Sequence, residues 1–280
     1  MKSAAVGASF VGLVTLACGV GTAPAPRPAE AARLPATFAS NGAELAFSLD
    51  LPAGTAPFPA VVLAHGSGHV TRDQLRWLSS QFTRLGFAVL RYDKRGVGES
   101  TGTYPNVGVG NSPALIPVLA NDVAAGVRFL RTRAEIDPAK IGLAGNSQAG
   151  WILPYAARAL GNAAFVVILA GPVCSVGLEI YYSNLAEFND RALDEVYALL
   201  PKFAGAPGYD PVPVLRDVNT PTLWLLGEDD RSIPVRDTVA NLAALKGGGR
   251  PFDWRIYPGL GHSLGPQIWN DIGPWVARFR

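Results

Sequence analysis

Short apolar runs separated by amphipathic stretches organise the chain after Pro59. The apolar runs cover residues 60–64, 87–90, 141–144, 165–169, 222–226 and 254–257. Runs that are apolar at nearly every position are typical of parallel strands buried on both faces of a sheet. Upstream, residues 36–39 and 45–51 flank Asn41-Gly42, a tight-turn pair that predicts an antiparallel hairpin. The pattern therefore predicts an α/β domain with a mostly parallel sheet of eight strands and helices on both faces.

Between these runs, apolar residues recur at the spacing of a helix. Leu115, Leu119, Val123, Val127 and Leu130 recur every three or four residues, so one long helix is expected to pack its apolar face on the sheet.

Residues 174–216 interrupt the alternation of strands and helices. This segment contains two weak helical patterns, over 178–188 and 193–200, followed by four prolines between positions 201 and 213. It is long for a simple connection. We therefore expect a short helical cap inserted into the domain.

Composition narrows the classes of partner. A chain of 280 residues with 49% hydrophobic residues is long enough for one large α/β domain. The net charge of +2, without a lysine and arginine cluster, excludes a nucleic-acid partner. Three histidines and two cysteines at wide spacing match no known pattern of metal ligands, and no metal is predicted. No obligate protein partner is predicted either.

The N-terminal residues have the features of a targeting segment. Lys2 precedes an uncharged run over residues 4–17, which is short for a membrane span and suits a signal peptide over 1–18. Two outcomes stay open: membrane attachment through a lipid on Cys18, or plain secretion with cleavage further on. Residues 19–34 are rich in alanine and proline and predict a tether before a domain over 35–280. Both outcomes predict an extracytoplasmic protein, which is secreted, periplasmic or lipid-anchored to the cell envelope.

The hexapeptide Gly145-Asn146-Ser147-Gln148-Ala149-Gly150 directly follows an apolar run. A serine hydroxyl is a poor nucleophile unless a sharp strand-to-helix turn holds it exposed beside a base, and small neighbours allow that turn to form. Ala149 replaces the last glycine of the usual G-x-S-x-G pattern, a difference of one methyl group. Ser147 is therefore a candidate nucleophile, although an ordinary junction with a capping serine would have similar residues.

A serine nucleophile needs a base and an acid. Of His65, His69 and His262, only the last lies C-terminal to the serine, on a glycine-flanked loop after the final strand. A carboxylate is needed to fix the imidazole tautomer and to stabilise its protonated form. The candidates at the end of the preceding strand are Asp230 and, as the alternative, Asp229.

Two backbone N–H groups are the usual donors to a tetrahedral oxyanion. Gln148, immediately after the serine, supplies one candidate. The second candidate is Ser67, because glycines in the loop 65–68 after the first parallel strand permit a close backbone approach. A plain glycine turn is the alternative interpretation of that loop.

Together these residues resemble the α/β-hydrolase superfamily, and more narrowly bacterial serine esterases of the dienelactone-hydrolase and prolyl-oligopeptidase-like kind. The resemblance covers essentially everything after the tether. Its motifs are residues 65–68, 91–100, 145–150, 170–172, the loop at 230–234 and residues 261–263. Residues 91–100 are expected to be architectural, with glycines that make turns and charges that pair locally, and receive no catalytic role.

The resemblance implies an α/β-hydrolase fold and a reaction. The family order of serine, acid and histidine selects Ser147, Asp230 and His262 as a triad, with Asp230 favoured because residues 230–234 turn into the next helix as the family's acid loop does. The implied activity is hydrolysis of small-molecule carboxylic esters, with short acyl chains, through an acyl-enzyme and without a cofactor.

Alternatives remain for the activity and for substrate contacts. A serine peptidase, a thioesterase or an acyltransferase would use the same fold and triad, and a noncatalytic envelope lipoprotein would use the fold to bind. Tyr181 and Tyr182 are candidates for contacting substrate under the cap, although aromatic residues at helical spacing also serve as packing.

Overall fold

The structure is a computed structural model that describes residues 36–280. The predicted signal peptide over 1–18, its Cys18 and the tether over 19–34 lie outside the described residues and stay predictions.

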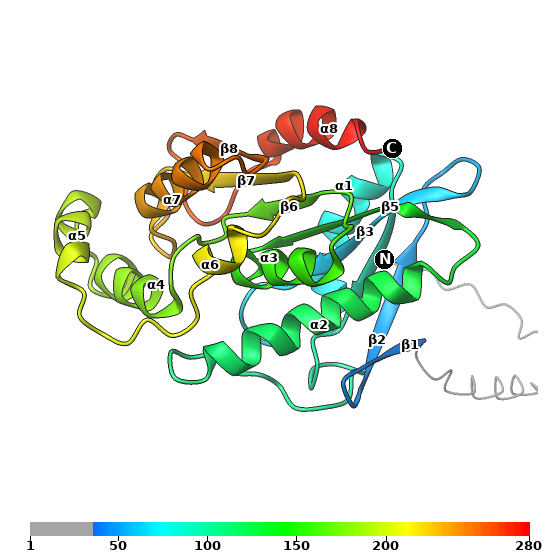
Figure 1. Ribbon diagram of the computed structural model, residues 1–280, viewed down its shortest axis with the longest axis horizontal. Coiled ribbons are helices and arrows are strands. Elements are labelled where there is room, and N and C mark those ends of the chain that lie inside the picture. Colours follow the sequence, from blue (N-terminus) through cyan, green and yellow to red (C-terminus); the bar gives the residue numbers. More distant parts are fainter. Residues whose placement is uncertain (1–35) are drawn as a thin grey trace, which may run out of the picture. The chain divides into compact units, whose positions relative to one another are not determined.

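Eight strands form one sheet in the order β1-β2-β4-β3-β5-β6-β7-β8 (Figure 1). The strands are β1 (Thr37–Ser40), β2 (Ala43–Asp50), β3 (Phe58–Ala64), β4 (Ala88–Tyr92), β5 (Ile136–Asn146), β6 (Val166–Leu169), β7 (Thr222–Gly227) and β8 (Phe252–Tyr257). The pairs β1–β2 and β2–β4 are antiparallel, and all other neighbours are parallel. Each apolar run that predicted a strand lies in one, so the predicted sheet is confirmed.

The first hairpin turns at the predicted pair. Asn41 and Gly42 both have positive φ, 43° and 75°. Two successive left-handed residues match the right-handed twist of the flanking strands, which is why asparagine followed by glycine favours this turn.

Helices cover both faces of the sheet (Figure 1). On one face lie α2 (Ser112–Leu130), α3 (Ala149–Leu160), α6 (Val212–Leu215) and α7 (Val235–Gly247), and on the other lie α1 (Arg76–Arg84) and α8 (Trp269–Ala277). Two short 3₁₀ helices, η1 (Arg72–Leu75) and η4 (Pro266–Ile268), precede α1 and α8.

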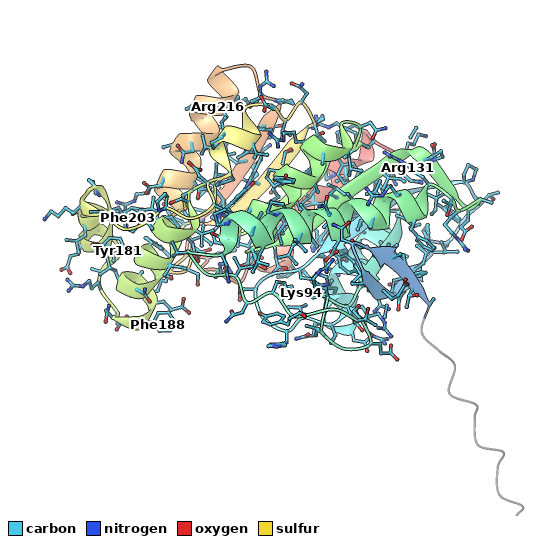
Figure 2. All side chains as sticks on the ribbon, turned by 60° about the horizontal axis from the view of Figure 1, so that its bottom comes forward. Lys94, Arg131, Tyr181, Phe188, Phe203 and Arg216 are labelled. Atoms are coloured by element: carbon cyan, nitrogen blue, oxygen red, sulfur yellow. The ribbon has the colours of Figure 1, made fainter. Side chains whose placement is uncertain are left out.

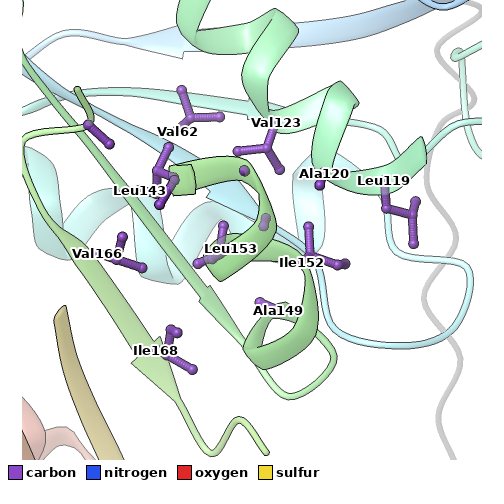
Figure 3. Packing of buried hydrophobic residues seen from close by; sticks show 14 of the residues in the cluster. Val62, Leu119, Ala120, Val123, Leu143, Ala149, Ile152, Leu153, Val166 and Ile168 are labelled. Carbon is purple, nitrogen blue, oxygen red and sulfur yellow. The ribbon is translucent and has the colours of Figure 1, made fainter. Parts of the chain in front are cut away.

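The core alternates between these faces along each strand. Val62 packs with α2 and α3, whereas Val61 packs with α1 and α8. Figure 3 shows the first of these layers, with Val123 and Leu153 above the strands. Each fully buried side chain of this kind contributes about 1.5–3 kcal/mol relative to leaving it exposed. Within residues 36–280, α2 is the one helix long and apolar enough to cross a membrane, but it packs on the sheet as a core helix.

The predicted helical cap lies between β6 and β7. It contains α4 (Val176–Ser183), the π-helical turn η2 (Asn184–Phe188), α5 (Leu193–Leu199) and η3 (Leu200–Lys202), and the chain then enters α6. Tyr182, Ala186, Val196 and Leu200 form a small apolar cluster within the cap. Figure 1 shows α4 and α5 at the left, beside the sheet and not upon either of its faces.

Candidate active site

The loops that follow β3 and β5 lie side by side. Ala64 pairs with Gly145 in the parallel register, so the two strands end at the same level. A Cβ atom added to Gly66 would lie 3.5 Å from the Ser147 Cβ and 3.1 Å from the Asn146 amide nitrogen. Glycine at position 66 therefore lets the predicted oxyanion loop approach the serine closely.

Ser147 occupies a strained turn between β5 and α3. Its φ is +54°, in the left-handed region that side chains other than glycine rarely adopt. The Ser147 N–H donates to the Leu169 carbonyl at 2.8 Å, and its carbonyl accepts from the Gly150 N–H at 2.8 Å. These bonds hold the turn on both sides and leave the side chain half-exposed.

The unusual glycine pattern around Ser147 has a packing explanation. A Cβ atom on Gly145 would lie 2.7 Å from the Ala149 Cβ, so the missing side chain at 145 makes room for the extra methyl group at 149. A Cβ atom on Gly150 would lie 2.7 Å from the Pro172 ring, so Gly150 permits close packing against the loop after β6. The departure from G-x-S-x-G therefore leaves the turn intact.

Asp230 and His262 are joined by a hydrogen bond. The His262 Nδ1 lies 2.8 Å from the Asp230 Oδ2, and the Asp230 Oδ1 accepts from the backbone N–H groups of Ser232 and Ile233 at 2.8 and 2.9 Å. Asp230 is fully buried. Asp229 is exposed, and its N–H donates to the Leu260 carbonyl at 2.8 Å, which ties the acid loop to the histidine loop. Of the two candidate acids, Asp230 is the one that meets the imidazole.

The surroundings of His262 favour its protonated form. Burial lowers the pKa of the imidazole, but the hydrogen bond and charge of Asp230, with smaller contributions from Glu179 and Glu187, raise it above its ordinary value. Glu179 belongs to α4, and burial together with the Asp230 charge raises the pKa of its carboxyl to about 7, against the lowering effect of His262. The cap therefore places the Glu179 carboxyl group close enough to His262 to influence its pKa.

The other two histidines have different surroundings. His65 is buried, and its Nε2 lies 2.5 Å from the Tyr92 carbonyl. Burial, assisted by the charge of Lys94, lowers the pKa of His65 to about 3 despite that hydrogen bond, so the ring is neutral. His69 is exposed, and its ring stacks on Tyr104 at a centroid distance of 3.8 Å.

A cavity of about 480 Å³ lies beside Ser147 and His262, and Gly66, Ser67 and Asn146 also line it. Its apolar lining comes from Val70, Leu75, Trp77, Leu78, Leu169, Ala170, Leu264 and Ile268. In the part of the chain that the structure describes, Ser147 and His262 share this cavity without a hydrogen bond between them, and such contacts often tighten only with substrate bound.

No group of three acidic, histidine or cysteine side chains within residues 36–280 lies where it could hold a metal ion.

The two predicted oxyanion donors lie on either side of the serine. Ser67 follows Gly66 in the β3 loop, and Gln148 precedes the first residue of α3. Within residues 36–280, neither backbone N–H donates to another protein group. Both groups are therefore free to donate hydrogen bonds to an oxyanion.

Tyr181 and Tyr182 are placed elsewhere. Neither lines the cavity beside Ser147. The buried Tyr182 hydroxyl donates to the Asp230 carbonyl at 2.6 Å, and the Tyr181 ring packs on Phe203 at 5.4 Å within the cap (Figure 2). The two tyrosines serve cap packing and docking, the alternative recognised from their helical spacing. Sequence reasoning missed Trp77 and Leu78 as cavity residues, although they follow the oxyanion loop closely.

The expected local pairing of charges within residues 91–100 is corrected. Arg91 pairs with Asp50 at 2.7 Å, Arg95 pairs with Asp122 at 2.6 Å, and Asp93 pairs with Arg72. These partners lie on β2, α2 and η1, outside the loop itself.

A model of the prolyl oligopeptidase family matches residues 73–270, more than half of the chain. The chain belongs to the prolyl oligopeptidase family. The match includes Ser147, Asp230 and His262. The acylamino-acid-releasing enzyme 1 of Oryza sativa subsp. japonica is 25% identical over 274 residues, which are 88% of this chain and 34% of that enzyme. This member of the family therefore spans about a third of the length of that relative.

Solved structures are similar in fold. An esterase of Pyrococcus furiosus matches with a TM-score of 0.64 at 17% identity, covering 87% of this chain and 88% of that one. An acetyl xylan esterase from Paenibacillus sp. R4 matches with a TM-score of 0.61 at 20% identity, covering 85% and 81%. The family and the sheet order together confirm the α/β-hydrolase fold, of the prolyl-oligopeptidase-like kind.

Proposed function

We propose that this protein is a serine hydrolase that cleaves carboxylic esters through an acyl-enzyme. The observation that carries the proposal is the 2.8 Å bond between Asp230 and His262, on a histidine that shares one cavity with a serine held at positive φ. A buried acid, an imidazole and a half-exposed serine in this arrangement are the parts that acyl transfer requires.

The first half of the proposed reaction acylates the serine. The Ser147 Oγ attacks the ester carbonyl carbon while the His262 Nε2 accepts its proton, and Asp230 stabilises the imidazolium. The carbonyl oxygen becomes an oxyanion that accepts hydrogen bonds from the N–H groups of Ser67 and Gln148. The intermediate collapses when the carbon–oxygen bond breaks and the leaving alkoxide takes the proton from His262.

The second half returns the enzyme to its resting state. His262 removes a proton from water as the water oxygen attacks the acyl carbon, and a second oxyanion forms in the same place. Its collapse releases the carboxylic acid, and the Ser147 oxygen takes back the proton from His262.

The composition of the cavity lining favours an uncharged substrate. Apart from His262, none of the side chains that line this cavity is ionisable. An apolar wall that includes Trp77 and Leu78 favours an ester with a hydrophobic group next to the carbonyl, because burying apolar surface is the main gain from such a pocket. Short acyl esters would fit within about 480 Å³. The proposal keeps the extracytoplasmic location that the N-terminal sequence predicts.

A peptidase activity is the second candidate, because the match to the rice acylamino-acid-releasing enzyme covers 88% of the chain. A substrate panel tests the choice: p-nitrophenyl acetate, butyrate and octanoate, a butyryl thioester, and N-acetylalanine p-nitroanilide. An esterase would show kcat/KM for the best ester at least about 100-fold above that for the anilide. Equal or faster cleavage of the anilide would overturn the esterase proposal in favour of the peptidase.

A further inference from the structure

A buried lysine lies directly behind the proposed oxyanion hole. Lys94, which is labelled in Figure 2, follows β4. Its side chain is almost completely buried, with 1% exposed. Its Nζ donates to the carbonyls of Gly66 at 2.6 Å and Gly68 at 3.2 Å, and to the Gln148 Oε1 at 3.3 Å. One ammonium group therefore binds both segments that carry the oxyanion donors.

The Lys94 ammonium has no counter-charge at rest. Among residues 36–280 no carboxylate lies within ion-pair distance of it, and the neighbouring Asp93 directs its carboxylate to Arg72. The groups that face Nζ are the neutral ring of His65 and the Tyr104 ring, whose centroid lies 5.8 Å away. Burial lowers the pKa of Lys94 to about 8. A buried charge without an opposite partner is costly, and proteins rarely retain one without a use for it.

The hydrogen bond to Gly66 acts on an oxyanion donor through one peptide group. The Gly66 carbonyl and the Ser67 N–H belong to the same planar peptide, and in a trans peptide they point in opposite directions. An ammonium on the carbonyl oxygen polarises that peptide and makes its N–H a stronger donor. The contact with the Gln148 side chain restrains the residue that supplies the second N–H.

We propose that Lys94 is a positioning residue for catalysis: it fixes the Ser67 and Gln148 donors and supplies the counter-charge for the oxyanion that forms beside them. This inference rests on the proposed function. The resting protein holds the cation without an anion, and the anion arises only as the substrate carbonyl becomes tetrahedral. The interaction is therefore stronger in the transition state than in the ground state, so its loss lowers kcat and leaves KM nearly unchanged.

Two substitutions of Lys94 test this assignment. Lys94→Met removes the charge and the hydrogen bonds at similar volume, and we expect kcat on p-nitrophenyl butyrate to fall about 100-fold with KM within about threefold. Lys94→Gln keeps a neutral donor and is expected to lose about tenfold. Lys140→Met is the matched control, because Lys140 is exposed on β5 and pairs with Asp137 at 3.5 Å.

Two further readouts separate this role from a merely structural one. The inhibition constant of an aliphatic trifluoromethyl ketone, whose adduct with Ser147 is an anion, should rise in Lys94→Met by the same factor by which kcat/KM falls. The wild type should lose kcat as the pH rises through about 8, because the ammonium then loses its proton, and Lys94→Met should lack this alkaline decline.

Three results would overturn the inference. They are a folded Lys94→Met variant with kcat within twofold of the wild type, a loss confined to KM, and a weakening of the ketone inhibitor much smaller than the loss of activity. If Lys94→Met does not fold, the wild-type pH profile and Gln148→Leu decide. Activity that stays flat to pH 9.5, or an unchanged kcat in Gln148→Leu, would then reject the role.

Labelling with a fluorophosphonate distinguishes failure of this inference from failure of the proposed function. If the wild type neither labels at Ser147 nor hydrolyses esters, the serine hydrolase proposal fails and the role of Lys94 fails with it. If the wild type labels and turns over but Lys94→Met behaves like Lys140→Met, only the assignment of Lys94 fails.

Discussion

The Asp230 carboxylate and the Lys94 ammonium are both buried charges beside Ser147, but their surroundings differ. Asp230 accepts hydrogen bonds from His262 and from two backbone N–H groups, so it is satisfied before substrate arrives. Lys94 contacts three neutral oxygens and no carboxylate within residues 36–280. The acid–base half of the site is thus electrostatically complete at rest, whereas the oxyanion half holds an unbalanced positive charge and two free N–H donors.

This difference indicates how the two halves contribute to the reaction. The Asp230–His262 pair sets the protonation state of the base, so changes there should alter both the rate and its pH dependence. The Lys94 side gains its partner only as charge develops on the substrate, so changes there should alter the rate with little effect on ground-state binding. The following substitutions test that division, beginning with the largest expected effect.

Replacing Ser147 removes the atom on which both halves act. Ser147→Ala should lower kcat by about 10⁴- to 10⁶-fold and leave the fold intact, because the acyl-enzyme cannot form. An ester hydrolysis assay measures the loss of kcat, and far-UV circular dichroism checks that the fold is intact. Ser80→Ala, half-buried on α1 and outside the lining of the cavity, is the control and should keep full activity. A Ser147→Ala protein with undiminished turnover would exclude the assignment.

Replacing Asp230 disturbs the Asp230–His262 pair and leaves the oxyanion donors in place. Asp230→Asn should lower kcat by about 10⁴-fold. It should also move the acid limb of kcat/KM to lower pH, because Asp230 raises the pKa of His262 and the base must be neutral to act. Asp229→Asn, one residue away and exposed, should change neither quantity greatly. If Asp229→Asn has a larger effect than Asp230→Asn, the hydrogen bond between Asp230 and His262 is not the one that catalysis uses.

Moving the histidine loop away from the acid loop should have a smaller effect. A Cβ atom at Gly227 would lie 2.2 Å from the Gly261 carbonyl oxygen, so Gly227→Ala must displace the backbone next to His262. We expect a loss of about 1–3 kcal/mol in the free energy of unfolding and of at least about tenfold in kcat. Urea denaturation and steady-state kinetics measure these changes. Gly247→Ala, with no atom within 4 Å, is the control, and equal behaviour of the two variants would reject the steric argument.

The smallest expected effect concerns the cap. Glu179→Gln removes a negative charge that raises the pKa of His262, so the acid limb of kcat/KM should move to lower pH by a few tenths of a unit, with kcat at pH 8 nearly unchanged. Glu195→Gln, exposed on α5, should leave the profile where it is. A shift to higher pH, or equal shifts in both variants, would show that the field of Glu179 does not reach the imidazole.

Local sequence signals predicted the sheet, the Ser147 turn and the Asp230 and His262 loops. Each of these depends on periodicity or on a few adjacent residues, and the Ala64–Gly145 register brings the pieces together at the ends of the strands. Lys94 was not predicted, because its three acceptors lie in the loop after β3 and in the turn before α3, far away in sequence. The available signal was a lysine close behind the apolar run 87–90, with the charged neighbours Asp93 and Arg95.

The residues that line the cavity were not predicted for a similar reason. Tyr181 and Tyr182 have the composition of a binding surface, but the direction in which a helix presents its aromatic residues is set by tertiary packing. In the structure, one tyrosine docks the cap on Asp230 and the other stacks on Phe203, while Trp77 from α1 lines the cavity.

Covalent trapping of the nucleophile is the most direct test of the central claim. The full-length protein is incubated with an alkyl fluorophosphonate and its peptides are mapped by mass spectrometry, with His262→Ala run in parallel. We expect one phosphonyl group on the peptide that contains Ser147, formed far more slowly without His262. An active wild-type enzyme that stays unmodified at Ser147, or carries the label on another residue, would contradict it.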